Sequence, residues 1–318
     1  MKNVLVLGGT GYVGRSLVER LVERNGGGGG RVIVPTRRIA HGTALRLLPT
    51  VELVEADVHD ERTLARLVGQ ADAVVNLIAI LHGSRSQFQR VHVELPRRLA
   101  HVCAAAGGKR VVHVSALGVG AGGPSNYLRS KTEGEAALQS PGVALTIVRP
   151  SLIFGAEDRV LNVFADLQAM APVVPLPGGD AKMQPVWIED VTTAIVRCLD
   201  DNTTIGQVYE LAGPKVYTLS EIVRLAGRWS GHERRQIPLP DAVGRLQATL
   251  MEALPGTPLM SRDNLDSMRV PNVASGKLPG LQALGIEPAA MEAVAPGYLG
   301  SAFGRARYGR WRGLARRG

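Results

Sequence analysis

Short apolar runs and amphipathic stretches alternate over the first half of the chain. The run 4–7 leads into a helical pattern over 15–24, and the same order of strand and helix then repeats. Strands that are buried on both faces of a parallel sheet consist of such continuous Val, Ile and Leu runs. The pattern therefore predicts an α/β fold with a doubly wound parallel sheet. Its further strands are expected at 31–35, 51–54, 71–77, 110–115 and 143–148, and two later helices at a long stretch ending near 106 and at 127–139.

The pattern is less regular beyond Pro150. An amphipathic stretch at 159–170 is followed by prolines at 172, 175, 177 and 185. A short strand entering a helix is predicted over 187–199, with Asp190 as N-cap, and a strand at 207–211. A further helix is expected to start at Thr218-Leu-Ser-Glu221. We therefore expect a smaller, loop-rich C-terminal region that serves as a lid or docking surface.

Composition describes an ordinary globular protein. The 318 residues are 45% hydrophobic with a mean hydropathy of +0.05. No apolar run approaches the roughly 20 residues of a membrane helix, and the chain opens directly into a strand, so no signal peptide is expected. Cys103 and Cys198 fall in predicted helices and are interpreted as buried, reduced side chains. No metal site is predicted. These features indicate a cytoplasmic protein.

The positive charge is concentrated at the C-terminus. The formal net charge is +9, and the basic tail 301–318 holds six arginines and no acid, at positions 305, 307, 310, 312, 316 and 317. The rest of the chain is only mildly basic, so specific nucleic-acid binding is not indicated. Phe303, Tyr308, Trp311 and Leu314 lie among the arginines, a composition that suits an anionic membrane surface. RNA, an acidic subunit surface and a merely solvated tail remain alternatives.

The first strand runs into a glycine motif. Gly9, Gly11 and Gly14 have the G-x-G-x-x-G spacing between a strand and a helix, which is the arrangement that binds the pyrophosphate of a dinucleotide at a helix N-terminus. The sequence therefore predicts a Rossmann fold. The residues of this loop that are expected to bind the cofactor are Gly8, Gly9, Thr10, Gly11, Tyr12, Val13 and Gly14.

The second strand indicates which dinucleotide is bound. NAD-binding folds usually place an acid near its end, whereas this chain has Thr36-Arg37-Arg38 there. Two guanidiniums can pair with a 2′-phosphate that a carboxylate would repel, so NADP(H) is predicted in preference to NAD(H). Asp57 and Val58 are expected near the adenine. Asn76 and Ala79 are expected along the middle of the cofactor, although an ordinary strand end explains them nearly as well.

Candidate acid–base residues follow the fifth strand. Ser115 ends that strand at the carboxyl edge, where open α/β sheets bind ligands. Tyr127 and Lys131 are four residues apart and share one helix face. A nearby ammonium is expected to stabilise the phenolate and so to lower the pKa of the tyrosine toward neutral pH. Ser115, Tyr127 and Lys131 are therefore the predicted catalytic residues.

These motifs resemble those of the short-chain dehydrogenase/reductase superfamily, in its extended and atypical branches. The likeness covers about residues 1–225, including Arg149-Pro150 and Pro185-Val-Trp-Ile-Glu-Asp190-Val. A narrower resemblance is to the nucleotide-binding accessory subunits of respiratory complex I (alpha-subcomplex subunit nine) and their bacterial relatives. It rests on Tyr127-Leu-Arg-Ser-Lys131, on Arg149-Pro-Ser-Leu-Ile-Phe-Gly155-Ala-Glu-Asp158-Arg159, and on Leu259-Met-Ser-Arg262-Asp263-Asn264. The resemblance implies tight NADP(H) binding, with Lys131, Pro150 and Ile153 also at the cofactor.

Two positions depart from the enzymes of this superfamily. His92 stands where they carry an asparagine, which puts the proton relay in doubt unless the histidine replaces it. Leu152 stands where they have a sugar-contacting asparagine, which favours an apolar substrate or none. Two hypotheses stay open: an oxidoreductase acting on a carbonyl or alcohol, and a non-catalytic NADPH-holding subunit of a respiratory membrane complex, placed in the cytoplasm or at the inner face of the membrane.

The predicted organisation has three parts. Residues 1–155 are the NADP-binding Rossmann domain, to which a segment near 186–212 returns. Residues 156–300 are the substrate or docking region, and 301–318 are the basic tail.

Overall fold

The computed structural model describes residues 2–26, 29–120, 122–254, 256 and 258–300. The chain forms two compact units. The first combines Met1–Pro150, Ile188–Leu211 and Ala274–Glu287, and the second combines Ser151–Trp187, Ala212–Val273 and Pro288–Gly318. The basic tail 301–318 lies outside the described residues.

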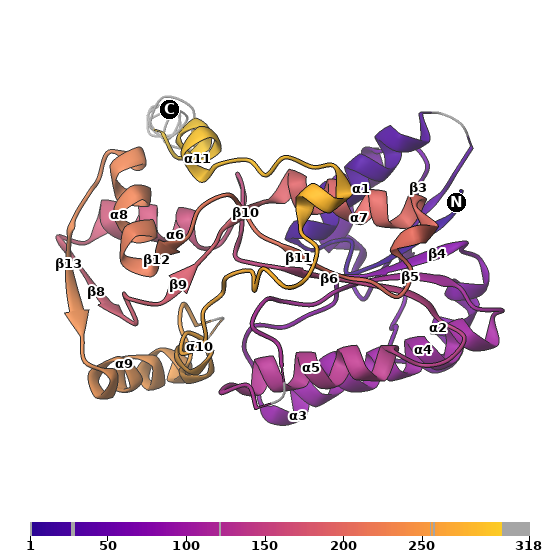
Figure 1. The fold of residues 1–318 in the computed structure, drawn as a ribbon, viewed down its shortest axis with the longest axis horizontal. Helices are drawn as coiled ribbons and strands as arrows, with labels where there is room; N and C mark the ends of the chain where they lie inside the picture. The colour runs from indigo at the N-terminus through magenta and orange to yellow at the C-terminus, as the bar shows by residue number, and fades with distance from the viewer. Residues whose placement is uncertain (1, 27–28, 121, 255, 257, 301–318) are drawn as a thin grey trace, which may run out of the picture. The chain divides into compact units, whose positions relative to one another are not determined.

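A seven-stranded parallel sheet is the centre of the first unit (Figure 1). Its order is β3-β2-β1-β4-β5-β6-β11, which confirms the predicted doubly wound Rossmann sheet. The central strands β1 and β4 are fully buried, and all of their residues except Asn76 are apolar. The strands are β1 Val4–Leu7, β2 Val32–Thr36, β3 Val51–Glu55, β4 Ala73–Asn76, β5 Arg110–Val114, β6 Ala144–Pro150 and β11 Val208–Leu211.

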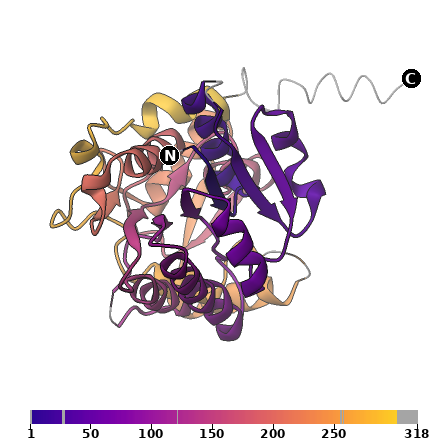
Figure 2. The same cartoon turned by 90° about the vertical axis from the view of Figure 1, so that its right-hand side faces the viewer.

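Helices cover both faces of this sheet. Helices α1 (Tyr12–Asn25) and α7 (Ile188–Asp200) pack together on one face, where Arg20 pairs with Glu189. Helices α2 (Glu61–Gly69), α4 (Leu95–Ala105) and α5 (Asn126–Leu138) cover the other face. Figure 2 shows the same layers from the side that is on the right in Figure 1. The 3₁₀ turns of this unit are Ile39–Leu47, Asn202–Thr204 and Leu281–Leu284.

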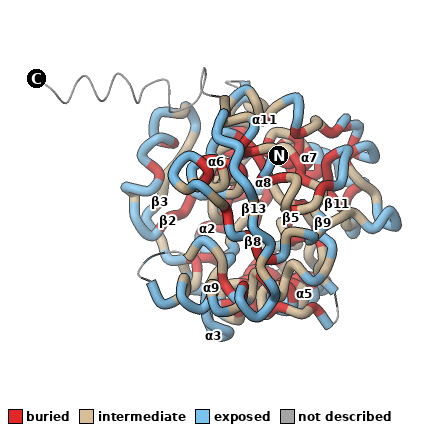
Figure 3. Tube along the Cα trace, turned by 90° about the vertical axis from the view of Figure 1, so that its left-hand side faces the viewer, coloured by how far each residue is buried: buried red, intermediate tan, exposed pale blue. Residues whose placement is uncertain are grey.

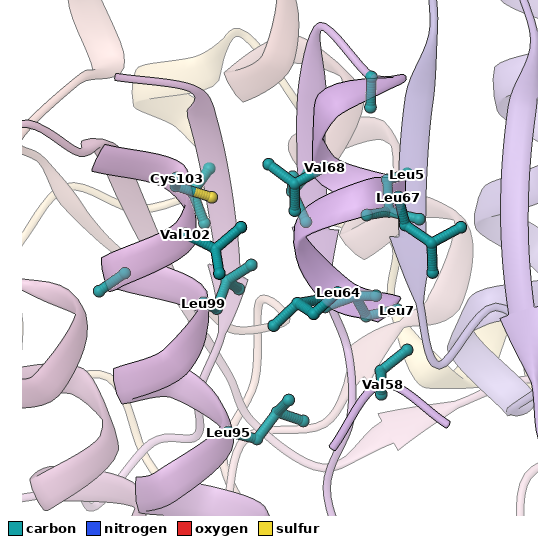
Figure 4. Close-up of a cluster of buried hydrophobic side chains, with 14 of the residues drawn as sticks. Leu5, Leu7, Val58, Leu64, Leu67, Val68, Leu95, Leu99, Val102 and Cys103 are labelled. Atoms are coloured by element: carbon teal, nitrogen blue, oxygen red, sulfur yellow. The ribbon is translucent and has the colours of Figure 1, made fainter. Parts of the chain in front are cut away.

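The core beneath α2 and α4 is made of the apolar stripes of these helices. In Figure 4, Leu95 and Leu99 of α4 face Leu64 and Leu67 of α2, with Leu7 of β1 beside them. All five side chains are completely buried. The cluster therefore fixes both helices on the strands whose ends carry the candidate site.

One local prediction was wrong. Asp190 does not cap α7, because the helix already begins at Ile188, directly after the strand β10 (Val186–Trp187). The long helix expected after β4 is present and ends at Ala105. It contains a π-helical segment at Gln89–Glu94 between α3 (Arg85–Phe88) and α4, which the sequence pattern did not predict.

The second unit holds three small two-stranded sheets. They pair β7 (Ile153–Phe154) with β10, β9 (Lys182–Met183) with β12 (Tyr217–Thr218), and β8 (Val173–Pro177) with β13 (Arg235–Leu239). The prolines of β8 suggested a loop, and the strand exists because it has only one neighbour to bond. Helix α8 (Leu219–Ser230) starts as predicted, with a Thr218–Glu221 capping box. The other helices are α6 Leu161–Met170, α9 Asp241–Ala253, α10 Arg262–Ser267 and α11 Met291–Leu299.

None of the described helices is long and apolar enough to cross a bilayer.

Helix α5 packs closely against the π-helical segment at Gly134. A Cβ at this position would lie 2.0 Å from the carbonyl oxygen of His92, whereas nothing lies within 4 Å of a Cβ at Gly69 in α2. We expect Gly134→Ala to lower the free energy of unfolding by about 1–3 kcal/mol through overpacking. Gly69→Ala, the matched control, should change it by less than about 1 kcal/mol. Denaturant titration measures both, and equal effects would contradict the packing argument.

Candidate nucleotide and acid–base site

The glycine loop brings β1 and α1 into close contact. Gly8 has φ +84°, and its carbonyl oxygen accepts a 3.0 Å hydrogen bond from the Gly11 N–H. A Cβ at Gly14 would lie 2.3 Å from that same oxygen, so only glycine permits this approach. Helix α1 begins at Tyr12 without a side-chain cap and without an acid in its first turn. The positive end of the helix is therefore suited to an anionic group.

The other predicted cofactor residues lie at the ends of neighbouring strands. Because the strands are parallel, their carboxyl ends meet at the edge where the glycine loop lies. Ile153 is in β7 of the second unit. The residues that the first unit brings to this edge are Thr36 at the end of β2, Arg37 and Arg38 after it, Asp57 and Val58 after β3, Asn76 and Ala79 at and after β4, Ser115 after β5, and Pro150 at the end of β6.

Arginines outnumber acids around His59, at the edge beside β2 and β3. Arg37 and Arg38 are exposed. The pKa of His59 is lowered, first by burial and then by Arg90, with Arg98 and Arg37 adding to the effect against the opposing charge of Asp57. His59 was not among the predicted residues. A single histidine beside a strand end carries no sequence signal that separates it from a surface residue.

Asn76 shapes the turn after β4 with both ends of its amide. Its Nδ2 donates to His113 Nδ1 at 3.2 Å, and its Oδ1 accepts the Ile78 N–H at 3.2 Å. These bonds use the side chain to hold the backbone of residues 76–78. Asn76 therefore fixes the shape of this turn.

Ser115 and Lys131 are both buried below the edge of β5. The Ser115 N–H donates to Val148 O at 2.8 Å, but its Oγ has no hydrogen-bond partner among the described residues. Lys131 Nζ donates to Val114 O at 2.8 Å. A buried hydroxyl without a partner costs about 1–3 kcal/mol, so this oxygen is suited to a ligand atom.

Burial sets the protonation of the pair on α5. It lowers the pKa of Lys131 to about 8, against the raising effect of Glu135, and it raises the pKa of Tyr127 to about 12. The expectation that the Lys131 ammonium lowers the pKa of Tyr127 is therefore wrong for this structure, because desolvation of the phenolate dominates. Tyr127 is a neutral phenol near pH 7, which makes it a proton donor.

A buried ion pair lies one helical turn beyond Lys131. Arg149 of β6 donates from Nε to Glu135 Oε1 at 2.9 Å and from Nη2 to Oε2 at 2.5 Å. Glu135 is only 4% exposed. The sequence analysis missed this partner, although Glu135 stands at i+4 from Lys131. The bidentate pair holds α5 on β6 and keeps a carboxylate near the buried ammonium.

His92 does not have the arrangement of a proton relay. Its Nε2 accepts the Ile80 N–H at 3.1 Å, and its Nδ1 lies 2.8 Å from Ser130 Oγ. Burial and then the charge of Lys131 lower its pKa to about 3. Both ring nitrogens are thus engaged by the protein, and the idea that His92 replaces the relay asparagine is not supported by this geometry.

Comparison with known proteins shows the family of the chain. The family model "NAD dependent epimerase/dehydratase family" matches residues 4–212. The chain belongs to this family. This confirms the resemblance to extended short-chain dehydrogenases and their Rossmann fold.

The relatives of this chain include subunits of respiratory complex I and reductases. The chain is 33% identical over 294 residues to the alpha subcomplex subunit 9 of mitochondrial NADH dehydrogenase from Mus musculus, covering 90% of the chain and 77% of the relative. It is 31% identical over 241 residues to a ceramide reductase from Caulobacter vibrioides, covering 75% and 74%. A nucleoside-diphosphate-sugar epimerase from Staphylococcus aureus has the same fold, with TM-score 0.72, 17% identity and coverage of 91% and 98%.

Proposed function

We propose that the chain is an NADP(H)-dependent oxidoreductase that acts on a carbonyl or alcohol of an apolar small molecule. The observation that carries this proposal is the buried Ser115 hydroxyl beside β5, which has no hydrogen-bond partner among the described residues, together with the half-buried Tyr127 and the buried amine of Lys131 on α5. A helix and a strand end with a purely structural role do not require these groups to be desolvated together.

The residues divide the acid–base work. The Ser115 O–H donates a hydrogen bond to the substrate carbonyl oxygen, and Tyr127 transfers its proton to that oxygen as the alcohol forms. The Lys131 ammonium, one helical turn away, attracts the tyrosinate left behind, although burial outweighs this attraction in the pKa of Tyr127. A bound nicotinamide would supply the hydride to the carbonyl carbon, and the glycine loop 8–14 with Arg37 and Arg38 would hold its dinucleotide.

Two observations support an apolar substrate. Leu152 replaces the sugar-contacting asparagine of related enzymes and packs against the apolar core of the second unit. One relative bears the name ceramide reductase, which denotes a long-chain lipid substrate. We infer that the carbonyl belongs to a lipid-like molecule.

The cofactor preference follows from the arginines after β2. We expect NADPH to bind at least about tenfold more tightly than NADH, equivalent to about 1.4 kcal/mol. Changing Arg37 and Arg38 together to alanine should abolish that preference and leave NADH affinity nearly unchanged, because only the 2′-phosphate contacts are removed. Fluorescence titration with both nucleotides measures this. Equal affinities in the unmodified protein would refute the assignment.

The catalytic role of Tyr127 is tested with a panel of long-chain ketones and NADPH. Tyr127→Phe should reduce kcat about 10²- to 10⁴-fold and leave NADPH affinity nearly intact, since the hydroxyl serves proton transfer. Purification without added ligand, followed by identification of the released nucleotide, shows whether its redox state turns over. Full kcat in Tyr127→Phe would remove the tyrosine from the mechanism.

A second candidate function is an NADPH-holding accessory subunit of a complex I-like respiratory assembly. The mitochondrial relatives suggest it, and the surface of α9 favours it. Val243, Leu246, Leu250 and Leu254 recur at helical spacing and are 46%, 61%, 62% and 66% exposed. Figure 3 shows where α9 lies on the molecule, coloured by burial. The flanking Arg245 and Arg262 are paired with Asp241, Asp266 and Glu252. This uncharged face therefore suits a protein surface better than an anionic lipid.

The tail 301–318 is the expected link to a membrane in that function. Each arginine near an anionic leaflet contributes on the order of 1 kcal/mol, so six hold the protein peripherally at the inner face. We expect salt-sensitive co-sedimentation with anionic vesicles, lost when residues 301–318 are deleted, while NADPH binding persists. Neutral vesicles are the control. Equal sedimentation of the full and shortened chains would show that the tail does not contribute to membrane binding.

A further inference from the structure

His92 lies in an uncommon piece of backbone. It belongs to the π-helical segment Gln89–Glu94, between α3 and α4, and it is 2% exposed. π-helical turns are rare and frequently occur at functional sites. The segment packs directly on α5, where Gly134 leaves room for the carbonyl oxygen of His92.

The hydrogen bonds of His92 have a defined direction. A peptide N–H can only donate, so the Nε2 that faces Ile80 N must be the unprotonated nitrogen. In the neutral ring Nδ1 then carries the proton and donates to Ser130 Oγ. The Ser130 hydroxyl in turn donates to the carbonyl oxygen of Tyr127 at 2.8 Å. The tautomer is thus assigned by its partners.

The ends of this chain of bonds are a peptide N–H and a peptide carbonyl. Neither titrates in the working range, so the chain transmits position and no proton. It joins the loop after β4, which is expected to line the cofactor, to the first turn of α5, which carries Tyr127. The imidazole also packs edge-on against the Tyr127 ring, with 5.6 Å between centroids and an interplanar angle of 82°.

We propose that His92 is a positioning residue that holds the Ile80 loop and the Tyr127 ring in register. Its effect on turnover rests on the proposed oxidoreductase function, whereas its effect on the loop does not. The ring must stay neutral for this, because a proton on Nε2 would remove the acceptor for Ile80. The lowered pKa of His92 agrees with that requirement.

Two substitutions separate the two arms of the imidazole. The side-chain oxygen of His92→Gln reaches the position of Nε2 and keeps the acceptor for Ile80, whereas His92→Asn is shorter and reaches only toward Ser130. Amide hydrogen exchange of Ile80 is the direct measurement. We expect it to accelerate about tenfold or more in His92→Asn and to change by less than about threefold in His92→Gln. His101→Asn, at an exposed histidine of α4, is the matched control and should change nothing.

Function is followed by NADPH titration and by the pH dependence of turnover. His92→Asn should weaken NADPH binding about tenfold, and His92→Gln should keep both wild-type affinity and the shape of the wild-type pH profile. Ser130→Ala leaves the imidazole in place and should keep the Ile80 amide protected, which covers the case in which His92→Asn fails to fold. Unchanged Ile80 exchange in His92→Asn, or loss of a pH limb in His92→Gln, would overturn the proposal. If no substrate turns over, the exchange and NADPH measurements still decide it.

Discussion

The burial of the Lys131 amino group determines the chemistry of the carboxyl edge of the sheet. A cation without water needs partners, and Lys131 has the carbonyl oxygen of Val114 and a nearby carboxylate, Glu135, which Arg149 holds in place. The positive charge of Lys131 also affects two nearby histidines. It adds to the burial that lowers the pKa values of His92 and His113. Two imidazoles are thereby kept neutral, and a neutral imidazole can accept on one nitrogen and donate from the other.

That neutrality explains how the strand ends are shaped. His113 accepts from Asn76, whose amide also holds the turn at Ile78, and His92 accepts from Ile80 two residues later. Both histidines thus hold the loop after β4, one from beneath the sheet edge and one from the π-helical segment. Protonated rings would lose these acceptor nitrogens. The loop is therefore tied indirectly to the same buried lysine.

The sequence predicted the features that depend on local spacing. The glycine loop is a short contiguous motif, the doubly wound sheet follows from the alternation of strand and helix patterns along the chain, and Ser115, Tyr127 and Lys131 all fall within residues 115–131. The features it missed depend on contacts distant in sequence. Arg149 and Glu135 lie on different elements, and β8 is a strand only because β13 pairs with it. Asp190 is not the N-cap because α7 begins at Ile188, directly after β10. The sequence showed that His92 replaces the asparagine of related enzymes. The roles of its two ring nitrogens could not be predicted, because they depend on contacts with Ile80 and Ser130.

The π-helical segment also sets the rotation of the helix that follows it. Each residue advances an α-helix by about 100°, and a π-helical turn contains about one residue more than an α-helical turn. Leu95, Leu99 and Val102 of α4, which follow this segment, face α2 (Figure 4). Loss of one residue within 89–94 would turn α4 by about a quarter of a revolution and direct charged side chains at the core. The length of this segment is thus as strictly constrained as any side chain in the site.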